Sequence, residues 1–469
     1  MKYIPRVCSS GPWQHSIRIF LHLRSTIRFP GTAAFARSTR DDSPTLPFNK
    51  NNRGQVLNIH TNRAPRVLFI SALVLPFNAL AQGLVDDTTA TLNFRNFFFE
   101  RNFTAPDVAQ SQAREWTQGF IFDLKSGFTQ GTIGFGVDVL GKYAVKLDGG
   151  AGRYGALLLP KDADGDPAGS FGRLGVAVKA KLSNTEIKVG EWMPNFPIVT
   201  VDDFRALPQT FRGAQIASQE IKNWSFYAGE LSKTSLRNDS SMEDLSFGSA
   251  RSDAFDFLGA DYRSTSKNTT VRLWSGELKD IYEQHYLGLN QKWPLTERVS
   301  VNANLGFFWG KDSGSAKAGQ LDNRTASALL SLNIAEHAIS LGLQNVSGET
   351  GWMRIGGTGG IYLANNTFNH GFDNPRERSW QVRYDLNFVG YGVPGLSFMT
   401  RYVHGDNVEL KNVDDGSEWV RESELGYVVQ SGTLKSLSVR WRNSSVRRNY
   451  NASDYDENRL ILSYPLNIL

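Results

Sequence analysis

Between residues 90 and 469 the chain repeats segments of roughly ten residues in which apolar and polar side chains alternate. Segment 299–309 shows the pattern clearly: Val301 and Leu305 fall on one face, and Asn302 and Asn304 fall on the other. Successive side chains of a β-strand point to opposite faces, so each segment has one apolar and one polar face. Repetition along the whole chain predicts an all-β fold, a transmembrane antiparallel β-barrel with lipid outside and a watery lumen inside.

The basic charge of the chain is confined to its first 81 residues. They carry 11 Lys and Arg against 2 Asp and Glu, whereas the remaining chain carries 40 against 44, so the net charge of +5 does not indicate a nucleic-acid partner. An apolar run at 67–75 follows Arg63 and Arg66, and Ala79-Leu-Ala81 fits a small-x-small cleavage site. We therefore expect a secretory signal peptide at 63–81, because the run is too short for a transmembrane helix.

Residues 1–62 have no clear periodicity and would make an abnormally long start to a signal peptide. A Ser- and Arg-rich, acid-poor leader is also typical of an organelle transit peptide, but a full secretory signal follows it directly. We interpret 1–62 as an atypical leader or the result of a misassigned start codon. Residues 82–469 then form the barrel.

The alternating segments number eighteen, and short and long connections follow one another along the chain. This rhythm is typical of periplasmic turns and extracellular loops, and an even strand number predicts that both barrel termini lie on the periplasmic side of a bacterial outer membrane. One connection, 279–280, is short where a long loop is due. The predicted strands lie near residues 90–99, 115–125, 132–143, 172–182, 185–192, 213–221, 223–231, 255–264, 269–278, 281–292, 298–309, 324–334, 337–346, 379–389, 395–404, 419–430, 434–443 and 457–466.

The side chains that face the lumen decide what a pore admits, and the strand at 434–443 shows how the alternation identifies them. Val439 and Trp441 take the lipid face, which leaves Arg440 and Arg442 in the lumen, about 7 Å apart along the strand. Arg95 can join them if the last strand closes on the first. The predicted substrate-binding residues are Arg383, Arg401, Arg440, Arg442, Arg459, Lys179, Lys181 and Lys188.

A row of cations in a pore attracts carboxylates and lowers the barrier to their entry, and paired arginines suit bidentate binding of a carboxylate. The sequence therefore predicts passive, selective diffusion of small carboxylate-bearing solutes. The structural alternative is that these cations pair with Asp123, Asp138, Asp385 or Glu424.

Two long connections have compositions unlike those of mobile surface loops. Residues 190–213 are hydrophobic and proline-rich, so we expect them to fold into the barrel as a constriction; the alternative is a lid over its mouth. Residues 356–378 contain two glycine pairs and several amides, which suit close packing in the lumen. The predicted constriction residues are Asp202, Asp203, Arg205, Arg212, Asn369 and Asp373.

Four stretches of the chain resemble the OprD-type outer-membrane porins: 392–407 (GVPGLSFMTRYVHGDN), 208–213 (PQTFRG), 377–380 (ERSW) and 456–465. The resemblance covers essentially residues 83–469. It implies an eighteen-stranded, substrate-specific channel with an inward loop and a ladder of basic residues, which takes up amino acids or small aromatic and aliphatic acids as a monomer. The terminal strand has the alternation expected of a substrate of the barrel-assembly machinery, although the chain ends in Leu469 rather than phenylalanine.

Enzyme and metal chemistry have no recognisable sequence motif. The chain lacks HExxH and GxSxG, and its only cysteine, Cys8, lies in the leader, so we expect no cofactor and no metal. The run Asp162-Ala-Asp-Gly-Asp166 resembles the start of a calcium loop, but Pro167 replaces the turn glycine and Arg173 the last acidic ligand. The competing functions are a general diffusion pore and, from another class, a barrel-embedded hydrolase or adhesin.

Overall fold

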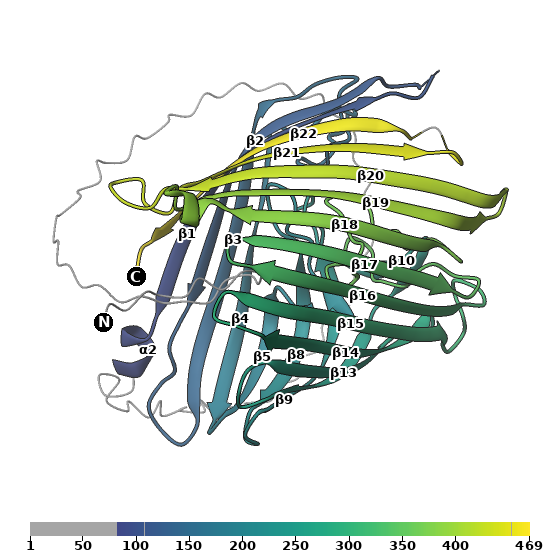
Figure 1. Cartoon of the computed structure of the whole chain (residues 1–469). Helices are drawn as coiled ribbons and strands as arrows, with labels where there is room; N and C mark the ends of the chain where they lie inside the picture. The colour runs from purple at the N-terminus through teal and green to yellow at the C-terminus, as the bar shows by residue number, and fades with distance from the viewer. Residues whose placement is uncertain (1–81, 107, 452) are drawn as a thin grey trace, which may run out of the picture. The chain divides into compact units, whose positions relative to one another are not determined.

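The computed structural model describes residues 82–106, 108–451 and 453–469, which form one closed antiparallel β-barrel (Figure 1). Of the twenty strands in its sheet, β10 and β11 form a hairpin in a long connection, and the other eighteen make the wall. The leader and signal peptide predicted at 1–62 and 63–81 lie outside the described residues. The wall strands are β1 Thr89–Phe103, β2 Gln112–Lys125, β3 Gly134–Asp148, β4 Ser170–Leu182, β5 Thr185–Trp192, β8 Thr210–Ser218, β9 Trp224–Ser235, β12 Phe255–Arg263, β13 Thr269–Leu278, β14 Tyr282–Pro294, β15 Val299–Asp312, β16 Asp322–Ile334, β17 His337–Ser347, β18 Arg378–Asn387, β19 Leu396–Leu410, β20 Val413–Val428, β21 Ser438–Arg448 and β22 Tyr455–Asn467.

The smaller elements are not part of the wall. Helix α2 spans Gln82–Asp86 before the first strand, and the 3-10 helix η1 spans Phe388–Tyr391 between β18 and β19. The remaining elements are two hairpins, made of β6 Asn195–Phe196 with β7 Val199–Thr200 and of β10 Glu243–Phe247 with β11 Ala250–Ser252.

The ring closes where the first strand pairs with the last. β1 runs antiparallel to β22 with Phe98 opposite Leu460, and Ile468 N donates a hydrogen bond to Ala90 O at 2.7 Å. Because the wall has an even number of strands, the start of β1 and the end of β22 lie together, at the end of the barrel that carries the short turns. The predicted count of eighteen strands is confirmed.

The wall is apolar on its outer face and polar inside. On β17, Leu341 and Leu343 are 56% and 63% exposed, whereas Ser340 and Gln344, which alternate with them, are buried. Burial of polar groups inside and exposure of leucine outside invert the pattern of a water-soluble sheet, and they match a wall that faces lipid. None of the helices in the described part of the chain is long and apolar enough to span a membrane.

One connection differs from its prediction. Residues 405–418 were expected to form a long loop, but β19 continues to Leu410 and β20 begins at Val413, so only two residues form the turn. The pairing contains register shifts between Gly405 and Leu410. This part of the hairpin projects beyond the apolar band and has charged residues on both faces, which hide the alternation. The irregular short connection at 279–280 is confirmed, since β13 ends at Leu278 and β14 starts at Tyr282.

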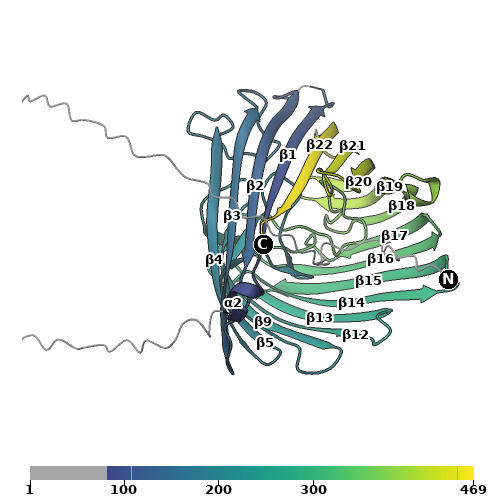
Figure 2. The same cartoon turned by 90° about the vertical axis from the view of Figure 1, so that its left-hand side faces the viewer.

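Three long connections fold into the barrel rather than away from it: 149–169, 193–209 and 348–377. Loop segments inside the ring are visible in Figure 2. Their apolar residues pack on inward-facing wall residues in continuous clusters, one of which joins Leu158 and Leu207 to Phe99. The lumen is therefore filled across much of its width by ordered loops.

Candidate functional site: the loop-narrowed lumen

The 193–209 loop is tied to the lumen face of β1, β2 and β3. Arg95 donates to Asp203 Oδ1 at 2.6 Å, and Lys142 donates from Nζ to Pro208 O at 2.9 Å. A Cβ added to Gly119 of β2 would lie 2.9 Å from Ala206 O, so glycine permits the close approach of loop and wall. The predicted inward fold of this loop is confirmed.

The tip of the 348–377 loop reaches the adjacent part of the wall, at β20 and β22. Phe368 N donates to Glu422 Oε1 at 2.9 Å, and Asn369 Nδ2 donates to Glu457 Oε1 at 2.8 Å. The side-chain oxygen of Asn369, Oδ1, accepts from Arg205 at 3.2 Å and from Arg459. Asn369 therefore joins the two inward loops to each other and to the wall.

Seven arginines of β18, β19, β21, β22 and β1, which lie in one arc of the ring, project into the lumen at the level of the inward loops; we call them the arginine wall, and Arg448 of β21 lies beyond them towards the long loops. Phe368 lies among three of them, with guanidinium carbons 4.2 Å from its ring centroid for Arg442, 5.4 Å for Arg401 and 5.9 Å for Arg459. Such cation–π contacts hold the loop tip against the arginines. The members of the arginine wall are Arg95, Arg101, Arg383, Arg401, Arg440, Arg442 and Arg459.

Most members of the arginine wall are paired with carboxylates, as the structural alternative anticipated. Arg401 pairs with Glu422 at 2.6 Å, Arg383 with Asp385 at 2.6 Å, and Arg442 with Glu424. Arg95 pairs with Asp203, and Arg101 and Arg459 share the single carboxylate of Glu457. Within the arginine wall, Arg440 alone has no carboxylate within 4.0 Å among the described residues; its guanidinium donates only to Ser438 Oγ, at 3.4 Å. Positive charge is therefore in excess along this wall.

The three predicted lysines lie apart from the arginine wall. Lys179 of β4 and Lys188 of β5 both pair with Asp138, at 2.6 and 2.8 Å. Lys181 is exposed near the short-turn end, with Nζ 5.6 Å from the Phe128 ring centroid. Because one carboxylate neutralises much of their charge, Lys179 and Lys188 contribute less to the potential than the alternation alone predicted.

The predicted constriction residues have different surroundings. Asp202 pairs with Arg237 and is buried, whereas the Asp203 side chain is 48% exposed beside Arg95. Asp373 pairs with Arg354 of its own loop at 3.0 Å. Asp203 thus remains accessible to a solute, and Asp202 and Asp373 instead stabilise the loops.

Arg205 and Arg212 were both predicted to line the constriction, but Arg205 is buried and Arg212 points away from the lumen. Arg205 is buried, donates to Ala156 O at 2.9 Å, and has its pKa lowered by burial and by the neighbouring Arg459 guanidinium. Arg212 was predicted to line the constriction, and this is wrong: it belongs to β8, where it is exposed on the side opposite the fully buried Phe211. Alternation along the strand turns its side chain away from the lumen.

Sequence reasoning missed the third inward loop, 149–169, and the residue that anchors it. Glu115 of β2 is buried and accepts hydrogen bonds from four backbone N–H groups of the loop, at 3.0 Å from Gly155, Ala156 and Leu158 and at 3.2 Å from Leu159. The apolar run 156–159 inside a supposed surface loop was the available signal. The 162–166 stretch forms a turn in which Asp162 Oδ1 accepts from the backbone of Asp164 and Asp166.

The wall from β9 to β15 is aromatic inside, in contrast to the arginine wall. Phe196 of the 193–209 loop stacks on Trp274 with ring centroids 4.5 Å apart, and Trp352 of the 348–377 loop packs edge-on against Phe308 at 5.3 Å. Each of these loops therefore runs from the aromatic side of the lumen to the basic side. The narrowed lumen is therefore lined by aromatic side chains on one side and by the arginine wall on the other.

The family model for outer membrane porins of the OprD family matches residues 82–468. The chain belongs to the OprD family of outer-membrane porins. This porin is 50% identical over 405 residues to porin-like protein GalP of Pseudomonas putida, a match that covers 86% of this chain and 97% of the relative. The resemblance noted in the sequence is thus confirmed, and the barrel is that of a bacterial outer-membrane channel.

Solved structures agree with this assignment. A BenF-like porin from Pseudomonas fluorescens Pf-5 superposes with a TM-score of 0.81 at 54% identity, covering 82% of this chain and all of that one (100%). OccK2 (OpdF) of Pseudomonas aeruginosa, solved in complex with glucuronate, gives a TM-score of 0.76 at 53% identity, with 83% and 100% covered. These relatives are channels, and no catalytic family is indicated for this porin.

Proposed function

We propose that this porin conducts small carboxylate-bearing solutes, such as amino acids or aromatic and aliphatic acids, by passive and selective diffusion. The observation that carries the proposal is the unbalanced charge of the arginine wall. Arg440 lacks a carboxylate partner among the described residues, and Arg101 and Arg459 divide one between them. An anionic group that reaches this region gains charge-assisted hydrogen bonds without displacing an existing ion pair.

The narrowing by ordered loops favours selectivity over general diffusion. A pore that forces a solute past facing apolar and cationic surfaces discriminates by shape and charge, whereas a wide aqueous channel does not. The complex of OccK2 with glucuronate, a sugar acid, supports a carboxylate as the class of solute.

The orientation and assembly of the barrel belong to the same proposal. We expect the short-turn end, with both termini of the barrel, to face the periplasm and the long loops to face outward, as in other outer-membrane barrels. We further expect a monomer that is inserted by the barrel-assembly machinery, with outer-membrane lipid as its surroundings.

The proposal is tested by neutralising the unpaired cation. Arg440→Gln removes one lumen charge and breaks no ion pair, so the barrel should fold normally while its affinity for carboxylates falls. We expect glucuronate to block single-channel currents on the order of tenfold less strongly, which corresponds to ~1.4 kcal/mol. Planar-bilayer recordings at low ionic strength measure this effect, because salt screens the interaction.

Arg298→Gln is the control, since it removes one positive charge at the short-turn end from a side chain that is 72% exposed; its 3.4 Å pair with Glu336 is solvated and contributes little. It should leave the block unchanged. Large currents that are indifferent to the solute in the unmodified protein, or equal block of both variants, would contradict selective carboxylate transport and favour a general diffusion pore.

A further inference from the structure

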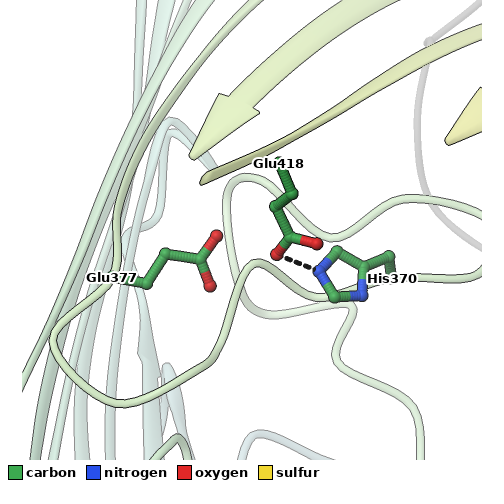
Figure 3. A group of neighbouring side chains, drawn as sticks. All are labelled: His370, Glu377 and Glu418. Carbon is green, nitrogen blue, oxygen red and sulfur yellow. Dashed lines mark hydrogen bonds and ion pairs between the residues drawn. The ribbon is translucent and has the colours of Figure 1, made fainter. Parts of the chain in front are cut away.

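A histidine and two glutamates meet where the 348–377 loop joins the barrel wall (Figure 3). His370 and Glu377 come from the loop, and Glu418 comes from β20. Each residue offers one ligand atom to a set whose members lie within 4.8 Å of one another. Both glutamates are buried, whereas the His370 side chain keeps 15% of its surface exposed, so solvent reaches this ligand.

One oxygen in this cluster has no hydrogen-bond partner among the residues that the structure describes. Glu377 Oε2 accepts from the backbone and side-chain nitrogens of Asn374, at 3.0 and 2.9 Å, but no described residue donates to Glu377 Oε1. Figure 3 shows the Glu377 carboxylate pointing toward Glu418 and His370. Gly405 of β19 leaves the space that this carboxylate occupies. A cation bound between the two carboxylates would satisfy this buried oxygen and relieve their mutual repulsion.

We propose that His370, Glu377 and Glu418 form a binding site for a divalent transition-metal ion of the zinc class. One imidazole nitrogen and two carboxylate oxygens are a donor set that zinc accepts, with water as the fourth ligand. Calcium and magnesium prefer oxygen ligands throughout, so the imidazole disfavours them. The site lies beside the arginine wall, towards the long loops, and none of its ligands pairs with a member of that wall.

Binding of the ion requires only small movements of the ligand atoms. Bonds of about 2.0–2.2 Å to a tetrahedral ion place ligand atoms about 3.4 Å apart. His370 Nε2 and Glu418 Oε1 are 2.5 Å apart, so they must separate slightly as the ion replaces the shared proton. Coordination through Nε2 moves the remaining ring proton to Nδ1, which releases the 3.3 Å contact from Arg448 Nη2.

Neighbouring groups keep the site in place while these changes occur. Arg448 retains its 2.8 Å bond from Nε to Glu418 Oε2 and its bonds to Ser453. Tyr450 also donates to Glu418 Oε2, at 2.8 Å. A divalent ion would let both glutamates be ionised together, because it adds the positive charge that the single Arg448 guanidinium does not supply.

A bound ion would act on the pore through the chain neighbours of His370. Asn369, the preceding residue, accepts from Arg205 and Arg459 and donates to Glu457. Fixing His370 to β20 therefore also fixes the loop tip in the lumen. We expect zinc to reduce current fluctuations in single-channel records without reversing ion selectivity.

The test is zinc binding by the purified full-length barrel in detergent, measured by calorimetric titration with zinc chloride. We expect one ion per barrel, with affinity lowered about 100-fold or more by Glu377→Gln and by His370→Gln. Glu349→Gln is the matched control, because it removes a carboxylate of the same loop whose side chain is 74% exposed. Heat-modifiable migration on a gel verifies that each variant is folded.

Anomalous diffraction at the zinc absorption edge provides the second measurement. A peak between His370, Glu377 and Glu418 is expected in crystals soaked in zinc chloride. The site is disproved by an absence of binding to the unmodified barrel, by equal binding in all three variants, or by a preference for calcium. The binding assay involves no transport, so its result is independent of the proposed carboxylate selectivity.

Discussion

Replacing both Phe368 and Asn369 with alanine should widen the pore and raise its single-channel conductance roughly two- to threefold, because the pore radius at the constriction limits conduction. Asn369 makes hydrogen bonds with three charged side chains, each worth about 1.5–3 kcal/mol. The Phe368 ring contacts three arginines, and each such contact contributes about 0.5–2 kcal/mol. Without both side chains the loop tip has little to hold it in the lumen.

The chain offers a matched control in Asn387 and Phe388, which are the same two residue types in adjacent positions and lie at the short-turn end. Asn387 caps η1 through a 3.0 Å bond to Val389 N, so its loss costs about 1 kcal/mol of stability, with no effect on the lumen. Planar-bilayer recordings of both double variants in the same salt compare the two. Equal conductance would mean that the tip of the 348–377 loop does not limit the pore.

Alternation in the sequence was sufficient to predict the barrel because lipid and water impose opposite demands on the two faces of each strand. Leu341 and Leu343 face lipid, and Ser340 and Gln344 face the interior, so period two is unmistakable there. The signal disappears beyond the apolar band, where water bathes both faces. The extension of β19 and β20 past Gly405 and Glu418 was missed for that reason.

The candidate site was only partly predictable, because alternation gives the direction of a side chain but not its partner. Arg442 was correctly placed inside, yet its pairing with Glu424 depends on the register of β20 against β21, which a single sequence does not contain. Arg212 was misplaced because it was assigned to a loop, whereas β8 already includes it, with a register shift between Arg212 and Gly213. One residue of offset reverses the side on which a side chain lies.

Loops that fold inward are predictable when their composition is incompatible with solvent. The prolines and apolar residues of 193–209 gave that signal, and the structure agrees. The run Ala156-Leu-Leu-Leu159 carries the same information, because three consecutive leucines do not suit a solvated loop. Its partner, Glu115, lies forty residues earlier, and only the fold brings a wall carboxylate to four loop amides.

Glu115→Ala should be the most destabilising single substitution among the wall residues discussed above. It removes every acceptor from four buried or half-buried N–H groups, and a buried donor left without a partner costs about 1–3 kcal/mol. Because the loop can relax and admit water, we expect a net loss of about 3–5 kcal/mol rather than the full sum. Urea unfolding of the barrel in lipid vesicles, followed by tryptophan fluorescence, measures this loss.

The release of the loop should also be visible without unfolding the barrel. Leu158 and Leu159 pack with Phe99 and Leu207, so freeing the 149–169 loop exposes it to protease and loosens the 193–209 loop beside it. Glu220→Ala is the control: Glu220 also accepts bonds from a backbone amide and two hydroxyls, but in a fully exposed turn where water replaces them. If Glu115→Ala and Glu220→Ala unfold at the same urea concentration and resist protease equally, the buried carboxylate does not anchor the loop, and packing of Leu158 and Leu159 alone must hold it in the lumen.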